Sequence, residues 1–360
     1  MTIPRPRAFA TSLICLSILV APVRAETLST EKAPEVAAIP TSLPADQNIA
    51  LQKQLAGLAS LRSAFGVAQE SYNNTPRTDI VVGSAQEANL NSKIAAVNQA
   101  RSAYISAVKK FNRDVAKAVA AERLRYIKMM SDYTHRLDWS KEKKDRVDAA
   151  LNKLAPDGDE NATSAMVRDV WTHMFARDSD KDLAAAAAQG HGPGFPGAGT
   201  QSREDCAVFA LANASGVPYG LVAASATDLI KHAEWRSAAD RAAPEQAFSR
   251  RGLNGGEVII MAETLGQASV VASTNFPKTL QAGHRILISV VPSDGDVESA
   301  HQVVLTKTFK HGGETWFAVM DSNQAPDQLL YLNAKELNTI LLETGVVFQP
   351  EPNRTPSLLR

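Results

Sequence analysis

The stretch that decides the fold is Gln201-Ser-Arg-Glu-Asp-Cys-Ala-Val-Phe209, which surrounds the cysteine at position 206. Polar, turn-forming residues lead up to this cysteine, and apolar residues at helical spacing follow it. Asp205 is a good N-cap residue, and Glu204 suits a helix start. The pattern therefore predicts that Cys206 lies at or near the first turn of a buried helix. There the backbone N–H groups and the helix dipole favour a thiolate, the reactive form of cysteine.

A secretory signal bears on whether Cys206 is reactive or only a small apolar core residue. The first 25 residues contain a charged start, a short apolar run and a signal-peptidase site, formed by Arg5 and Arg7, Ala8 to Val20, and Val23-Arg24-Ala25. The apolar run is too short to span a membrane. We expect cleavage after Ala25 and export of the mature protein to a periplasm or to the cell exterior.

Cleavage would leave Cys206 as the only cysteine of the mature chain, because the other one is Cys15. In an oxidising compartment thiols usually pair. An unpaired thiol there is either reactive or an intermolecular link.

The charge balance excludes some function classes. The 360-residue chain has 38 basic and 38 acidic residues, which argues against a nucleic-acid-binding surface. No segment after the signal has 18 consecutive apolar residues, so we expect no membrane span.

Hydrophobic periodicity predicts a helical first half. Residues 26–46 form a proline-containing linker, and residues 47–189 form a helical domain. Heptad-like patterns over 48–72 and 84–134 predict an antiparallel coiled-coil hairpin, either projecting as a stalk or packed as a bundle on its own domain. Shorter helices are expected over 141–154, 161–176 and up to residue 188.

The glycine- and proline-rich segment 190–199 cannot continue a helix and separates this half from a mixed one over 200–350, with a tail over 351–360. After the Cys206 helix we expect helices over 221–232 and 255–265, then strands over 285–291, 301–305, 316–320 and 328–332. Gly312-Gly313 predicts a hairpin between the second and third strands. Helices followed by an antiparallel sheet make an α+β fold.

A cysteine nucleophile needs a base, and the base needs an orienting acceptor. His301 opens one strand of the predicted hairpin and Asp321 closes the other. Either residue alone is more often a polar strand end or a turn former. Together, they would lie side by side at one end of the sheet. No HExxH or paired-cysteine spacing occurs, so neither a metal nor another cofactor is expected.

The arrangement of Gln201, Asp205-Cys206, His301-Gln-Val-Val-Leu305 and Val319-Met-Asp321 resembles the papain-like cysteine peptidases. The most similar members are the double-glycine leader-peptide peptidase domains of bacteriocin exporters and their stand-alone relatives. The stretch from Asp205 to Tyr219 is also similar to that family. The resemblance covers about residues 200 to 350. It implies a papain-like domain with Cys206 as nucleophile, His301 as base, Asp321 as its orienter and Gln201 as an oxyanion donor.

These features predict an exported thiol protease that cleaves a peptide or isopeptide amide, with the helical half positioning a protein partner or substrate, or self-associating. Two differences from the family favour an alternative, a catalytically inactive binding or adaptor protein acting through its coiled-coil half. Ala207 stands where the family usually has glycine, and Gln201 is one residue closer to the cysteine. A second alternative is a peptidoglycan endopeptidase, although those enzymes keep their histidine closer in sequence to the cysteine. Thiol reactivity discriminates between enzyme and adaptor.

Overall fold

The computed structural model describes residues 27–40, 43–77, 80–81, 83–193, 205–295, 300–324 and 328–350. The chain divides into two compact units, residues 1–122 and 123–360. The predicted signal segment 1–25 and the tail 351–360 lie outside the described residues.

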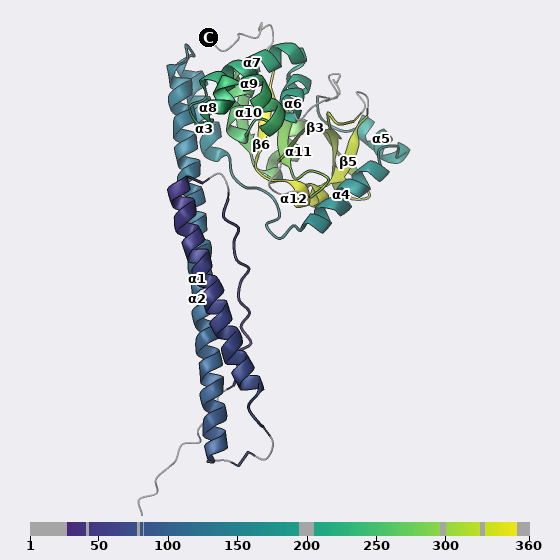
Figure 1. Cartoon of the computed structure of the whole chain (residues 1–360). Helices are drawn as coiled ribbons and strands as arrows, with labels where there is room; N and C mark the ends of the chain where they lie inside the picture. The colour runs from purple at the N-terminus through teal and green to yellow at the C-terminus, as the bar shows by residue number, and fades with distance from the viewer. Residues whose placement is uncertain are drawn as a thin grey trace, which may run out of the picture. The chain divides into compact units, whose positions relative to one another are not determined.

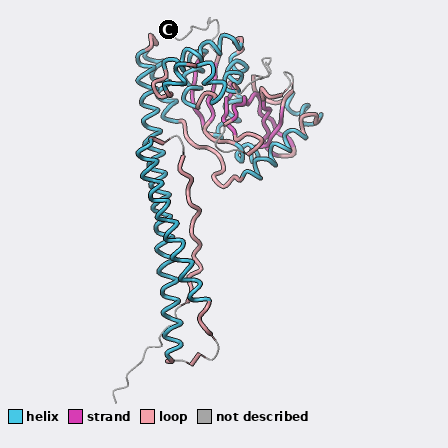
Figure 2. The backbone as a smooth tube through the Cα atoms, in the orientation of Figure 1, coloured by secondary structure: helices cyan, strands magenta, loops and turns pink. Residues whose placement is uncertain are grey.

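The first unit contains two long helices, α1 (Ala45–Asn73) and the first part of α2 (Ala85–Arg136), which pack side by side (Figure 2). Later residues of α1 contact earlier residues of α2, and earlier residues of α1 contact later residues of α2. Arg101 lies over the Phe65 ring, 5.3 Å from its centroid. Closer to the other end, α1 and α2 share an apolar cluster of Leu51, Leu58, Val108, Phe111 and Val115. The helices are therefore antiparallel, at the positions that the heptad-like pattern predicts.

Residues 27–40 have no helical or strand structure, yet Asn98 and Asn112 of α2 hold them by accepting from their backbone N–H groups and donating to their carbonyls. The sequence predicts a flexible linker here, and the structure instead places this segment along the hairpin (Figure 2). Local composition does not reveal these contacts, because the bonded residues are about 70 or more positions apart.

The second unit is built on a six-stranded sheet in which every pair of neighbours is antiparallel (Figure 1). The strand order is β1-β6-β2-β3-β4-β5. The strands are β1 (Gln267–Val271), β2 (Arg285–Val290), β3 (His301–His311), β4 (Glu314–Met320), β5 (Leu330–Asn333) and β6 (Gly345–Gln349). This sheet and its helices confirm the α+β fold class.

Strands β3 and β4 form the predicted hairpin. His311 pairs with Glu314 across a turn made of Gly312 and Gly313, whose φ angles are 59° and 83°. Both central residues need the left-handed region, which glycine adopts without steric cost. The hairpin brings the beginning of β3 and the end of β4 to the same end of the sheet.

Helices cover both faces of this sheet. Apolar side chains of β2 alternate between the faces, with Leu287 on one and Ile286 and Ile288 on the other. The Leu287 face carries the end of α2, α3 (Lys141–Lys153), α6 (Cys206–Ser215), α7 (Tyr219–His232), α9 (Pro244–Arg251) and α10 (Gly255–Leu265). The other face carries α4 (Ser164–Ala176), α11 (Phe276–Gln281) and α12 (Ala334–Ile340). Three short elements complete the unit, α5 (Lys181–Ala188), α8 (Ala238–Ala242) and the 3₁₀ helix Ser273–Asn275.

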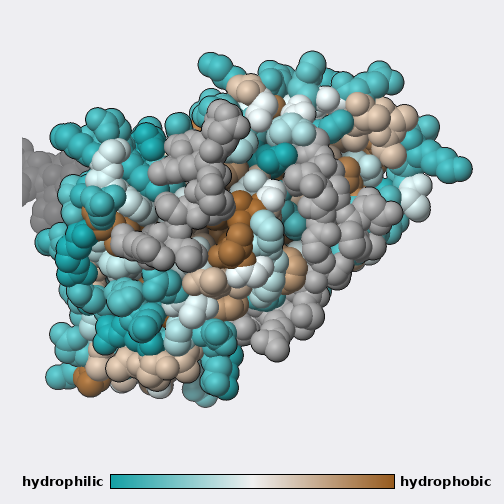
Figure 3. Space-filling view, turned by 90° about the horizontal axis from the view of Figure 1, so that it is seen from above, coloured by the Kyte–Doolittle hydropathy of each residue, from teal (hydrophilic) through white to brown (hydrophobic). Residues whose placement is uncertain are grey.

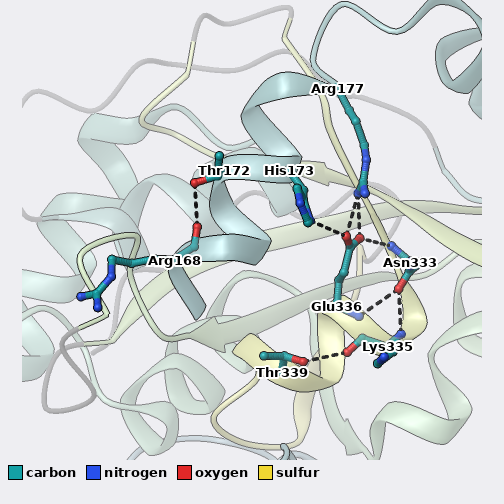
Figure 4. Close-up of polar contacts among 8 residues, drawn as sticks. All are labelled: Arg168, Thr172, His173, Arg177, Asn333, Lys335, Glu336 and Thr339. Atoms are coloured by element: carbon teal, nitrogen blue, oxygen red, sulfur yellow. Dashed lines mark hydrogen bonds and ion pairs between the residues drawn. The ribbon is translucent and has the colours of Figure 1, made fainter. Parts of the chain in front are cut away.

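Helices α3 to α5 belong to the sheet-containing unit, whereas the sequence places the domain border at residues 190–199. Arg177, the residue directly after α4, donates to both carboxylate oxygens of Glu336 at the start of α12, at 2.9 and 2.8 Å. Figure 4 shows His173 and the backbone of Asn333 converging on the same carboxylate. Short helices are marginal alone and gain their stability by packing, here against the sheet.

Within the described residues, no helix combines the length and apolar character needed to cross a membrane. The face of the molecule seen in Figure 3 is mainly hydrophilic, with apolar surface concentrated near its centre.

Gly345 tests the packing of the sheet. A Cβ added there would lie 2.5 Å from Cγ2 of Ile286 and 2.8 Å from Cε1 of Phe276. We expect Gly345→Ala to lower the free energy of unfolding by roughly 1–3 kcal/mol, because overpacking a core forces side chains off their rotamers. Gly220 of α7 has no such neighbour within 4 Å. Gly220→Ala should therefore raise stability by up to about 1 kcal/mol. Urea unfolding measures the change in the free energy of unfolding for both variants. Equal changes in the two variants would contradict the close packing of Gly345 against Ile286 and Phe276.

Candidate active site

Cys206 is the first residue of α6, as the sequence predicts, and only 9% of it is exposed. Asp205 occupies the N-cap position, and its backbone carbonyl accepts from the N–H groups of Val208 and Phe209. The first N–H groups of a helix have no partner within the helix. Cys206 therefore lies at the N-terminal, positive end of the helix dipole.

The Asp205 side chain does not cap the helix and instead accepts a hydrogen bond from the Tyr219 hydroxyl. The Tyr219 ring stacks on Phe209 of α6, with centroids 4.3 Å apart. The other carboxylate oxygen, Oδ1, is buried and has no hydrogen-bond partner within the described part of the chain. Tyr219 thus ties the side chain of Asp205, the residue immediately before Cys206, to the start of α7. The sequence alone shows no reason for this contact.

His301 and Asp321 lie side by side, as the hairpin predicts. Nε2 of His301 is 2.7 Å from Oδ1 of Asp321. His301 is the first residue of β3, and Asp321 directly follows β4. Both side chains are buried, so little water competes for this hydrogen bond.

Asn323 supports this pair from the turn after β4. Its backbone N–H donates to the same Oδ1 of Asp321 at 2.9 Å, and its Nδ2 lies 3.4 Å from Nε2 of His301. The backbone bond fixes the carboxylate that orients the imidazole. The sequence contains a weak signal for this backbone bond, since an aspartate side chain commonly accepts a hydrogen bond from the backbone N–H two residues further on.

Trp171 of α4 packs beside His301, with ring centroids 6.2 Å apart. Its indole Nε1 donates to the backbone carbonyl of Val291 at 2.8 Å, which fixes the ring. The buried indole shields one side of the imidazole. Nothing in the sequence indicates this contact, because Trp171 lies outside the region that resembles the peptidases.

The pKa of His301 is raised from 6.5 to about 10. Burial acts most strongly and lowers this pKa, but the combined effects of Asp321 and Cys206 outweigh it. Both contribute through side-chain hydrogen bonds and through charge. The imidazolium of His301 is therefore the stable form at neutral pH.

Gln201, the expected oxyanion donor, lies outside the described residues, and its role stays a prediction. Among the described residues, no group of three or more His, Cys, Asp or Glu side chains is arranged to hold a metal ion.

No protein-family model matches this sequence, and a search of curated proteins finds no match either.

Asp321→Asn tests the pairing with His301. Because the pKa of His301 is raised on folding, its stabilising contribution is complete below the unfolded pKa of about 6.5 and is lost as the pH rises through about 10. We expect Asp321→Asn to lower the free energy of unfolding by about 3–5 kcal/mol near pH 6. The difference from the wild type should shrink as the pH approaches 10.

Urea unfolding at several pH values measures this difference. Asp228→Asn is a matched control, since Asp228 lies 3.6 Å from the exposed His232 and such pairs contribute roughly 1 kcal/mol or less. A loss of stability for Asp321→Asn that stays constant from pH 6 to pH 10 would show that the charge of His301 is not involved.

Proposed function

We propose that this protein is a thiol hydrolase, most specifically a papain-like cysteine peptidase with a Cys206–His301–Asp321 triad. One observation carries the proposal. The imidazole of His301 has two acid–base partners, Asp321 at 2.7 Å and the thiol of Cys206. A nucleophile, a base and an orienting acceptor in one buried cluster are the parts that acyl transfer through a thiol requires.

The surrounding elements support the same proposal. The nucleophile begins a helix packed against an antiparallel sheet, the base begins a strand, and the acceptor follows the neighbouring strand. This is the arrangement that the resemblance to papain-like peptidases implies. Helix α4 adds the shield of Trp171.

The first chemical step is attack by the Cys206 thiolate on an amide carbonyl carbon. With Nε2 committed to Asp321, Nδ1 is the nitrogen of His301 that remains to exchange a proton with the sulfur or the leaving group. The new C–S bond forms, the C–N bond breaks, and the imidazolium gives its proton to the departing amine. The product of this half-reaction is a thioester on Cys206.

Water completes the cycle. The now neutral imidazole accepts a proton from a water molecule that attacks the thioester carbonyl. The C–S bond breaks, the acid product leaves, and the thiolate–imidazolium pair is restored. Asp321 stays ionised throughout and stabilises each imidazolium that forms.

The developing oxyanion needs preorganised donors. The backbone N–H of Cys206 is one candidate, because it belongs to the first turn of α6 and lies beside the sulfur. The side chain of Gln201 is the second candidate. Export of the protein, and the use of the helical half to position a substrate or partner, belong to the same proposal.

The decisive experiment measures the pH dependence of Cys206 alkylation by iodoacetamide, with peptide mass spectrometry to separate Cys206 from Cys15. An ordinary cysteine titrates near pH ~8.5, whereas a thiolate paired with an imidazolium reacts well below neutrality. We expect rapid labelling at about pH 5 in the wild type and loss of this labelling in His301→Ala.

His232→Ala is the matched control, because His232 ends α7 and its ring forms an exposed ion pair with Asp228. It should leave the labelling profile unchanged. Ordinary titration of an accessible thiol, independent of His301, would contradict the triad and favour the adaptor alternative. A thiol that resists labelling even at high pH would also count against the proposal, since a substrate carbonyl could not reach it.

A further inference from the structure

The first unit contains a set of contacts to an extended segment that does not involve the thiol site. Residues 27–40, called the arm below, are held on α2 although they form neither helix nor strand. The same bonding pattern occurs twice along the arm.

Asn98 makes the first contact. Its Oδ1 accepts from the Ser29 N–H at 2.9 Å, and its Nδ2 donates to the Thr27 carbonyl at 2.9 Å. Asn112 repeats the pattern on Ala37 and Glu35, at 2.9 and 2.8 Å. Each amide thus bonds to the main chain of two residues that are two positions apart. Each asparagine therefore uses both its oxygen, as an acceptor, and its nitrogen, as a donor, on the arm.

The spacing of the two asparagines shows that the arm is extended. They are two heptads apart on α2, which is roughly 21 Å at 1.5 Å per residue. The arm crosses this distance between Ser29 and Ala37. A helix of that length would cover only about 12 Å, whereas a strand could cover about 26 Å. An extended, slightly bent backbone fits.

Side chains add a second level of selection. Lys109 of α2 pairs with Glu31 at 3.0 Å. Val36, Ala37 and Ile39 pack against the apolar cluster that includes Val108 and Phe111. This face of α2 therefore matches an acidic side chain followed by aliphatic ones.

We propose that this face of α2, formed by Asn98, Lys109, Asn112 and the adjoining apolar cluster, binds an extended segment of a partner polypeptide, and that the arm is its built-in occupant. All four amide bonds contact main-chain atoms, which every sequence presents, so recognition tolerates sequence variation. The bonds are exposed or partly buried, which permits local opening. The partner is an unstructured peptide with an acidic residue about five positions before an aliphatic one.

Tethering makes the arm a strong competitor. A covalently attached occupant acts at an effective concentration in the millimolar range. A partner segment therefore binds well only when the arm is displaced. The arm would regulate access to this face of α2 in this way.

The experiment weakens the arm in the full-length protein. Ser29→Pro with Ala37→Pro removes the two N–H groups that the asparagines accept from, while proline still suits an extended backbone. The probe is a fluorescent peptide of residues 27–40, followed by anisotropy. We expect the proline variant to bind this probe at least roughly tenfold more tightly than the wild type, as relief of intramolecular competition requires.

Matched asparagine changes test the mechanism. Adding Asn98→Ala and Asn112→Ala to the proline variant should abolish binding of the probe. Adding Asn89→Ala should not, because Asn89 is an exposed asparagine on the same helix. No binding by a proline variant that keeps its helical circular dichroism would overturn the proposal.

Peptide variants test the class of partner. A probe that keeps Glu31, Val36 and Ile39 but has its other residues replaced by alanine or serine should still bind. A probe methylated at the backbone nitrogens of Ser29 and Ala37 should not. Binding of the native sequence alone would show that the arm is only an internal strap.

Hydrogen exchange covers the case in which the proline variant does not fold. In the otherwise unaltered chain, Asn98→Ala with Asn112→Ala should speed exchange at the Ser29 and Ala37 amides by roughly tenfold or more, because exposed amides exchange through local opening. Unchanged exchange at both amides would overturn the proposal. The thiol labelling described above should not change in these variants, so the two proposals fail separately.

Discussion

The hydrogen-bonded pair of His301 and Asp321 is the interaction on which the proposed chemistry depends. It exists because a two-residue glycine turn folds β3 back on β4, which brings the start of one strand beside the end of the other. Burial alone would make His301 neutral. Asp321 and Cys206 outweigh that effect and raise the pKa of His301, so the imidazole carries a positive charge at neutral pH.

Other buried charges of the second unit serve the framework of the site. Glu257 and Glu263 of α10 are fully buried, and each is bonded to an arginine, Arg236 and Arg146. Removing one partner of such a pair leaves an uncompensated charge in the core. These pairs hold α10 to the segments around it, and α10 packs with α6 in the same core. The position of the nucleophile helix therefore depends on polar contacts far from the thiol in sequence.

Much of this architecture follows from local pattern. Helical periodicity predicts most of the longer helices, and Gly312-Gly313 predicts the hairpin together with the pairing of His301 and Asp321. Strands β1 and β6 are not predicted, because each is short and its partners are remote, as in the pairing of Gln267 with Gln349. Trp171 and the arm are missed for the same reason. Their contacts join residues distant in sequence, and no local rule contains that information.

The charge state of His301 is the most direct test of the account, and nitrogen NMR of the imidazole reports it. The account predicts an imidazolium at pH 7 that loses its proton only near pH 10, with a lower apparent pKa in Asp321→Asn. Such values would belong to the coupled Cys206–His301 pair rather than to one residue. A neutral His301 at pH 7 that titrates near the ordinary value of about 6.5 would contradict the proposed triad.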